Sequence, residues 1–126
     1  MAMTVRFEIF PRDLDVTVEF YTEVLGFELV SDRRDDPEPY VALRRDSVHV
    51  GALRDAAAEQ RSERRPPVGV EIVLEVDDVN AELERVRTAG WPIAEGIEQR
   101  PWGLRDFRLL DPSGYYLRIT NRARTM

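Results

Sequence analysis

The residue types that could carry out catalysis or bind a metal are few in this chain. The sequence has one histidine, His49, and no cysteine, which excludes disulfides, thiolate metal sites and cysteine nucleophiles. A lone histidine on a strand of alternating polarity is more often a surface or satisfied core residue than a general base. We therefore assign no catalytic residue, and a catalytic His49 stays the alternative.

Other catalytic motifs are absent from the sequence. There is no P-loop, no glycine-rich dinucleotide fingerprint and no HExxH motif. None of the serines has the context of a nucleophile elbow. The carboxylate pairs Asp35-Asp36 and Asp77-Asp78 lie in a polar loop and at an expected helix start, where solvation and capping explain them.

Aromatic residues supply the other candidate chemistry, which is ligand stacking. Trp102 lies between Pro101 and Gly103, a rigid residue and a flexible joint. A tryptophan there could cover the mouth of a cavity or could fill the core, and composition alone favours the core. Phe107 and Tyr40 are the further rings that could face a ligand.

The first half of the chain predicts a strand, a helix and further strands. Residues 5–10 alternate apolar and polar positions, and Asp13 stands where a helix N-cap belongs. The helix is expected to run to Leu25, before Gly26. Its apolar stripe is Leu14, Val18, Tyr21 and Leu25. Strands are expected at 27–30, 40–43 and 47–53, with a polar loop at 31–39.

The second half repeats this order after a charged, proline-containing linker. Residues 68–76 form an expected strand, and Asp78 is a second N-cap, the counterpart of Asp13. A second apolar stripe, at Val79, Leu83, Val86 and Gly90, repeats the first at the spacing that separates the two caps. A strand at 91–94 and a hairpin, 105–110 and 115–120 joined by a turn at 111–114, complete this half. Such a duplication predicts two similar modules that enclose a cleft.

Composition limits the class of protein and its partners. The chain has 126 residues, 43% hydrophobic and 33% charged, as is ordinary for a globular domain. Its net charge of −6 argues against a nucleic-acid partner and favours a cationic ligand. No apolar run is long enough to span a membrane, and the N-terminus lacks the layout of a signal peptide, so we expect a cytoplasmic location.

The order and spacing of these motifs resemble the vicinal oxygen chelate superfamily, which holds glyoxalase I, extradiol dioxygenases and bleomycin-resistance proteins. The resemblance implies an α+β fold of two βαβββ modules forming a curved sheet around a cleft. The whole chain, 1–126, would be one such domain, with module 1 at about 3–54, a linker at 55–67 and module 2 at about 68–122. The motifs are Asp13-Leu14, Phe20-Tyr21, Leu25-Gly26-Phe27, Val76-Asp77-Asp78 and Asp111-Pro112-Ser113-Gly114.

Further residues indicate a branch of the superfamily: Pro101-Trp102-Gly103, Arg105, Phe107, Asp111-Pro112 and Gly114. In these residues the chain most resembles the bleomycin-resistance proteins. That resemblance implies a metal-free homodimer that sequesters a small molecule, with no cofactor.

The metal enzymes of the superfamily hold their ion at four strand positions, which the matched motifs locate here. The first falls on Arg6, the third on Glu71 and the fourth on Arg118, while the second lies on the strand that contains His49. Guanidinium groups stay protonated and offer no lone pair to a cation. Only Glu71 and His49 could coordinate, with Glu8 as a further candidate if the strand register slips by one residue.

We therefore predict a metal-free protein that binds a small aromatic ligand, with a cationic one favoured, and we do not predict an enzyme. Arg6, Glu71 and Arg118 could form an ion network, meet an anionic ligand group or lie in water at strand ends. A metal-dependent glyoxalase, lyase or dioxygenase is one alternative, and a dimeric module without a small ligand is another. The expected ligand-binding residues are Trp102, Phe107, Tyr40, His49, Arg118, Arg6 and Glu71.

Overall fold

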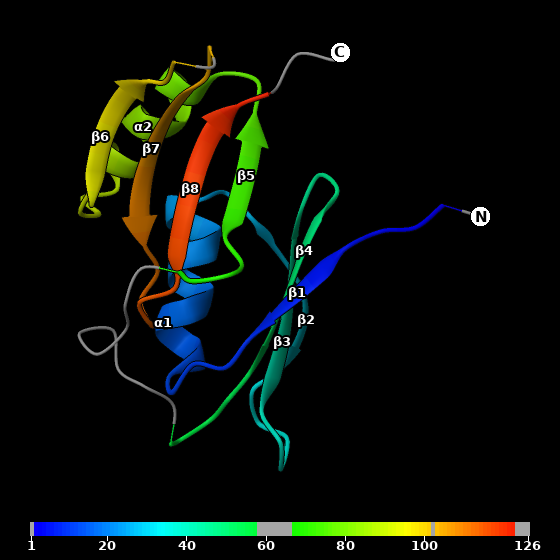
Figure 1. The fold of residues 1–126 in the computed structure, drawn as a ribbon. Coiled ribbons are helices and arrows are strands. Elements are labelled where there is room, and N and C mark those ends of the chain that lie inside the picture. The colour runs from blue at the N-terminus through cyan, green and yellow to red at the C-terminus, as the bar shows by residue number, and fades with distance from the viewer. Residues whose placement is uncertain (1, 58–66, 102, 123–126) are drawn as a thin grey trace. The chain divides into compact units, whose positions relative to one another are not determined.

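The computed structural model describes residues 2–57, 67–101 and 103–122. The chain divides into two compact units, Met1–Gln60 and Arg61–Met126. Each unit contains one four-stranded mixed sheet and one helical segment (Figure 1). No helix in these described ranges is long and apolar enough to cross a membrane.

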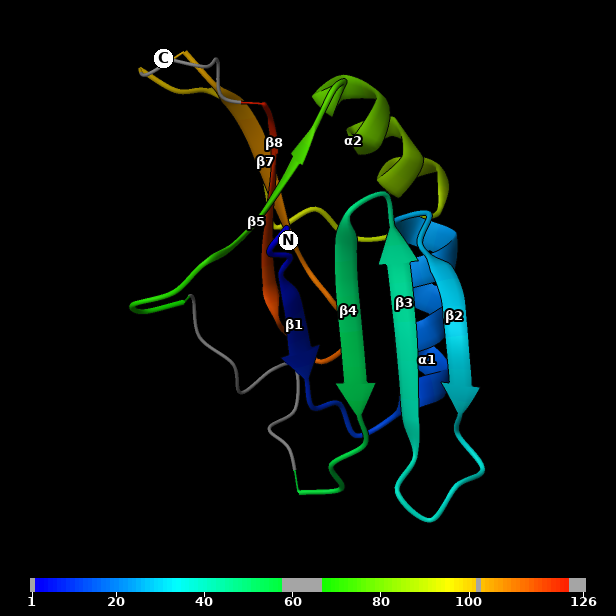
Figure 2. The ribbon, with the colours of Figure 1, turned by 90° about the vertical axis from the view of Figure 1, so that its right-hand side faces the viewer.

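The first unit follows the predicted order of a strand, a helix and three strands. Its sheet has the order β1-β4-β3-β2, with β1 parallel to β4 and the other neighbours antiparallel (Figure 2). Buried side chains alternate along β3 and form the core face of the sheet, on the side of α1. The elements are β1 (Arg6–Ile9), α1 (Leu14–Glu19), η1 (Phe20–Val24), β2 (Glu28–Arg33), β3 (Tyr40–Arg45) and β4 (Val48–Leu53).

The first helical segment begins as predicted but is not one continuous α-helix. The Asp13 carboxylate accepts hydrogen bonds from the N–H groups of Asp15 and Val16, at 2.9 and 3.3 Å. After Glu19 the segment widens into the π-helix η1, and the Thr22 hydroxyl donates to the Val18 carbonyl at 2.7 Å. Side chains that compete for helix carbonyls in this way favour local distortion. The segment ends at Gly26, whose φ is 74°.

The second unit repeats the topology of the first. Its sheet has the order β5-β8-β7-β6, with β5 parallel to β8 (Figure 1). Asp78 caps its helix by accepting from the Ala81 N–H at 3.0 Å, as predicted. The elements are β5 (Ile72–Val76), α2 (Val79–Thr88), β6 (Glu95–Gln99), β7 (Arg105–Leu110) and β8 (Tyr116–Asn121).

Several predicted strand bounds are wrong, each for a local reason. The strand expected at 91–94 is absent, because Pro92 lacks an N–H and the Trp91 indole N–H is held by the Leu110 carbonyl at 2.7 Å. The strand that follows is β6 instead. The strand expected from residue 68 begins only at Ile72, after Gly69 with its φ of 86°. Strand β2 extends into the polar loop expected at 31–39.

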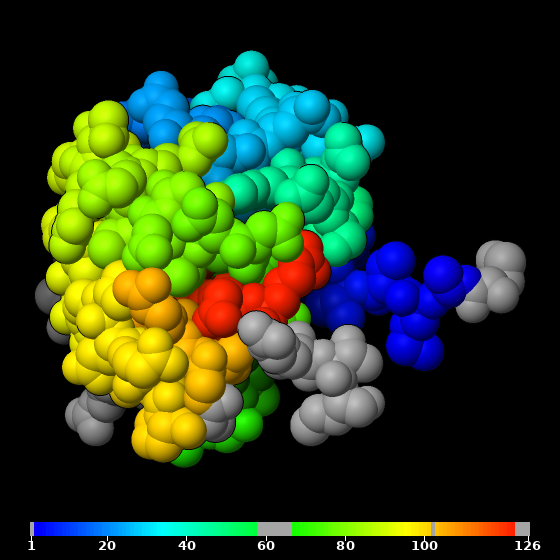
Figure 3. Space-filling view, turned by 90° about the horizontal axis from the view of Figure 1, so that it is seen from above, coloured from blue at the N-terminus to red at the C-terminus, as the bar shows by residue number. Residues whose placement is uncertain are grey.

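Exposed apolar residues precede β1 and β5, which are edge strands of their sheets. Met3 and Val5 are 95% and 76% exposed, and the N-terminal segment stands away from its sheet (Figure 3, blue). Val68 and Val70, their counterparts in the internal repeat, are 95% and 80% exposed. Both halves of the repeat therefore expose apolar side chains beside an edge strand.

Candidate functional site

The strand register of the first sheet brings predicted site residues onto one face. Arg6 of β1 lies opposite His49 of β4, and Glu8 lies opposite Gly51. Tyr40 of β3 shares that face, since its partner Leu53 is two residues beyond Gly51. We call this surface the first polar face, formed by Arg6, Glu8, Tyr40, Ala42, Arg44, His49 and Gly51.

Glu8 is the centre of a hydrogen-bonded cluster on the first polar face. Its carboxylate accepts from the Tyr40 hydroxyl at 3.0 and 3.3 Å and pairs with the Arg6 guanidinium at 2.7 Å. The Glu8 side chain remains 31% exposed, so it can still meet another group. Burial, followed by the hydrogen bond to Glu8, raises the pKa of the Tyr40 phenol.

Gly51 makes this cluster sterically possible. A Cβ atom at Gly51 would overlap the Tyr40 hydroxyl and both carboxylate oxygens of Glu8. The neighbouring cross-strand residue, Ala42, is also small. The hydrogen bond between Tyr40 and Glu8 therefore depends on the absence of a side chain at Gly51.

The second sheet carries a different set of charges on the equivalent surface, which we call the second polar face. It consists of Val73, Glu95, Asp106, Arg108, Tyr116 and Arg118, and Glu71 joins it through an ion pair with Arg118 at 2.9 Å.

Arg108 has several partners on this face. It donates to the Tyr116 hydroxyl at 3.0 Å and lies 3.3 Å from Glu95, and the bond to Tyr116 raises the pKa of Arg108. This face is therefore rich in paired charges, whereas the centre of the first polar face is formed by the small residues Ala42 and Gly51.

A buried ion pair borders the second polar face. The Asp106 side chain is 1% exposed and accepts three hydrogen bonds from Arg100, at 2.7 to 3.1 Å. These bonds raise the pKa of Arg100. The pair ties the turn after β6 to strand β7, because Arg100 also donates its N–H to the Leu104 carbonyl at 2.7 Å.

One of the predicted ligand-binding aromatic residues, Phe107, does not reach this surface. Phe107 is 0% exposed and lies opposite Ile119, on the core face, so the prediction that it offers a ring to a ligand is wrong. The alternation of β7 puts its neighbour Arg108 on the polar face instead. Trp102 lies outside the described residues.

The internal repeat identifies the second of the four metal-ligand positions, which the sequence placed on the strand of His49 without fixing the residue. Glu8 pairs with Gly51 in the first sheet, and Val73, the counterpart of Glu8 in the repeat, pairs with Arg118 in the second. Gly51 is therefore the internal equivalent of Arg118, and His49 corresponds to the register of Tyr116.

Four strand positions correspond to those at which the metal enzymes hold their ion, and we call them the four equivalent positions. Their residues do not suit a divalent cation. They hold Arg6, Gly51, Glu71 and Arg118, which together offer one carboxylate. That carboxylate, on Glu71, is already paired with Arg118. Among the described residues no three His, Cys, Asp or Glu side chains are grouped to hold a metal ion. A catalytic metal normally has three protein ligands, so this donor set does not fit one.

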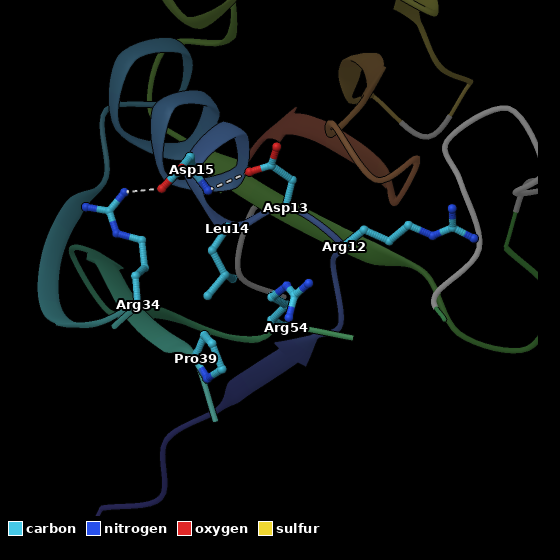
Figure 4. A pocket seen from close by; sticks show the side chains of 7 residues that line it. All are labelled: Arg12, Asp13, Leu14, Asp15, Arg34, Pro39 and Arg54. Atoms are coloured by element: carbon cyan, nitrogen blue, oxygen red, sulfur yellow. Dashed lines mark hydrogen bonds and ion pairs between the residues drawn. The ribbon is translucent and has the colours of Figure 1, made fainter. Parts of the chain in front are cut away.

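A cavity of about 370 Å³ lies in the first unit at the start of α1 (Figure 4). Its acidic groups already serve the fold, since Asp13 caps the helix and Asp15 pairs with Arg34 at 3.0 Å. Arg34 also pairs with Asp32 at 2.6 Å. We therefore interpret this cavity as a structural feature of the start of α1 and not as a ligand site. It is lined by Arg12, Asp13, Leu14, Asp15, Arg34, Pro39 and Arg54.

The sequence model of the glyoxalase/bleomycin resistance protein/dioxygenase superfamily matches residues 4–119. The chain belongs to this superfamily. Membership confirms the resemblance drawn from the motifs and the two βαβββ modules predicted from the repeat. No curated protein sequence matches the chain significantly.

Solved structures share the fold of this superfamily member at low sequence identity. TioX from Micromonospora sp. ML1 has a TM-score of 0.78 at 22% identity, covering 97% of this chain and 100% of its own. A bleomycin resistance determinant encoded on transposon Tn5 has a TM-score of 0.76 at 22% identity, with 98% and 100% covered. Lactoylglutathione lyase from Agrobacterium tumefaciens has a TM-score of 0.70 at 21% identity, with 95% and 92% covered. These neighbours include a resistance determinant and an enzyme, so they establish the fold alone.

Proposed function

We propose that this superfamily member is a metal-free protein that binds a small aromatic ligand on its polar faces. The observation that carries the proposal is the content of the four equivalent positions. Arg6 and Arg118 replace potential metal ligands and neutralise the neighbouring carboxylates Glu8 and Glu71. Such groups recognise polar atoms of an organic molecule and do not supply a Lewis acid.

The first polar face supports the aromatic and cationic part of the proposal. Tyr40 offers a ring for stacking, and the small residues Ala42 and Gly51 let it lie beside Glu8. Glu8, still partly exposed, can accept hydrogen bonds from a ligand amine. His49 lies in the next cross-strand row, between Arg6 and Arg44.

A homodimer and a cytoplasmic location remain further parts of the proposal. The exposed apolar residues Met3, Val5, Val68 and Val70 support an interface beside the edge strands β1 and β5.

The proposal is tested by thermal-shift screening of chelator-treated protein against aromatic cations, bleomycin included, followed by calorimetry of each hit. We expect saturable binding that needs no added metal. Glu8→Gln should weaken a cationic hit about tenfold, as expected for losing a hydrogen bond to a charged group.

Glu84→Gln is the matched control, because Glu84 makes an exposed ion pair with Arg87 on α2. It should leave the affinity unchanged. Binding that appears only after metal is added would instead favour the enzymes of the superfamily.

A further inference from the structure

Two buried nitrogen atoms on the second polar face lack a hydrogen-bond acceptor. They are Nε of Arg108 and Nε of Arg118, and they are the only buried side-chain nitrogen or oxygen atoms without a hydrogen-bond partner in the described parts of the chain. A buried donor without an acceptor costs free energy, and more so when the donor is charged. Two arginine Nε–H donors on the same surface are therefore unsatisfied.

The two arginines are direct neighbours. Arg108 of β7 and Arg118 of β8 are cross-strand partners in the antiparallel register and point to the same face. Two like charges at such positions repel each other, so their presence together requires compensation. Their internal equivalents in the first sheet are the small residues Ala42 and Gly51, so this feature belongs to the second unit only.

The surrounding groups compensate the charges but leave the Nε–H donors unused. Glu71 pairs with Nη2 of Arg118 at 2.9 Å. Glu95 and Asp106 lie 3.3 and 3.9 Å from Arg108 Nε without hydrogen-bond geometry, and Asp106 is engaged by Arg100.

An additional anion would therefore meet three carboxylates. An organic ammonium ion would bring further N–H donors to a face where two Nε–H donors already lack an acceptor. An uncharged oxygen with lone pairs satisfies both conditions.

We propose that the second polar face binds an uncharged acceptor oxygen of the ligand, such as a ketone, quinone or amide carbonyl, through Nε–H of Arg118 and Arg108. The inference rests on the proposed function and specifies one group of its ligand. Both arginine side chains reach the surface, at 24% and 20% exposure, so a ligand on this face can contact them, and a rotation of either side chain would turn its buried Nε–H toward a bound carbonyl.

The test follows the arginine Nε–H signals by nuclear magnetic resonance while small probes are added to the full chain. Acetophenone carries only an acceptor, 1-phenylethylammonium has a similar shape with only donors, and benzoate carries an anion. We expect acetophenone to shift the Arg108 and Arg118 signals saturably. The other two probes should bind this face at least about tenfold more weakly, the difference expected for one hydrogen bond to a charged donor.

Arg118→Lys and Arg108→Lys assign the two signals and keep the positive charges while removing each Nε–H. Either substitution should abolish the acetophenone shift of the remaining signal or weaken its binding about tenfold. Arg87→Lys, which removes the Nε–H of an exposed arginine on α2, is the matched control and should change nothing.

The inference is overturned if acetophenone leaves both signals unmoved, or if the ammonium probe moves them equally. Binding of 1-phenylethylammonium alone would leave the proposed function standing while this inference fails. If a lysine variant fails to fold, assigning the two signals through their backbone resonances lets the wild-type titration decide the question.

Discussion

Gly51 is the single residue on which the first polar face most depends. Its lack of a side chain lets the Tyr40 hydroxyl and the Glu8 carboxylate meet above it. Nothing in the sequence SVHVGAL distinguishes this glycine from one that merely tolerates a strand. The strand register does so, because it places Gly51 opposite Glu8 and equivalent to Arg118.

Gly51→Ala should destabilise the protein by about 1–3 kcal/mol, the usual cost of forcing extra volume into a packed site. The added methyl must displace Tyr40 or Glu8. Gly96→Ala is the matched control, since no atom lies within 4 Å of a Cβ placed there, and it should change stability by less than about 0.5 kcal/mol. Urea unfolding of both variants measures the difference, and equal stability of the two would contradict this role of Gly51.

The same substitution has a readout in pH. In the native protein the pKa of Tyr40 is raised above 10.0, the ordinary value for an unfolded tyrosine. The associated stability is present below pH 10 and is lost as the pH rises toward the native pKa. Ultraviolet titration should show a late-ionising tyrosine that Tyr40→Phe removes. In Gly51→Ala this tyrosine should ionise earlier than in wild type, because it is separated from Glu8.

At the scale of elements, the helix caps were predictable because their chemistry is local. Each cap is an aspartate whose carboxylate accepts from the free N–H groups one turn ahead. The spacing between the two caps, Asp13 and Asp78, also fixes the internal repeat and hence the arrangement of strands around each helix.

Removing one helix cap should therefore lower the free energy of unfolding by the amount typical of N-cap substitutions. Asp78→Ala should lower the free energy of unfolding by about 1 kcal/mol, because the Ala81 N–H loses its acceptor. Asp77→Ala, one residue earlier, removes only an exposed ion pair with Arg122 and should cost less than about 0.5 kcal/mol. Denaturant unfolding compares the two, and a larger loss in Asp77→Ala would refute the assignment of the cap.

The elements that the sequence could not predict depend on contacts distant along the chain. The strand expected at 91–94 is replaced by a connection that the bond from Trp91 to Leu110 holds in place. The π-helix after Glu19 combines a threonine bond to a helix carbonyl with packing of Tyr21 against Phe20 and Phe27, at ring distances of 5.0 and 5.5 Å. Neither feature follows from hydrophobic periodicity.

Much of the candidate site was predictable from spacing, but which residues face it was not. Counting from the two helix caps and from the turn residue Asp111 places Arg6, Glu71 and Arg118 on or beside the polar faces. Phe107 was assigned to the wrong face, although the alternation RDFRLL already puts it opposite to Asp106 and Arg108. Arg108 could have been found from that same alternation.

At the scale of the whole molecule, membership of the superfamily leaves binding and catalysis both open, because fold does not determine function. Our proposal of binding without a metal rests on the chain's own donor set. Arginine at two of the four equivalent positions and glycine at a third leave one paired carboxylate. Each unit has an ion-paired polar face, which we propose as the binding surface for an organic ligand.

The most direct test is calorimetric titration of chelator-treated protein with Ni²⁺, Zn²⁺, Mn²⁺ and Fe²⁺. The proposed metal-free function predicts no saturable, stoichiometric heat from any of these ions, and no difference between the wild type and Glu71→Ala. Stoichiometric binding that is lost in Glu71→Ala would contradict it, and would identify Glu71 as a metal ligand despite its pairing with Arg118.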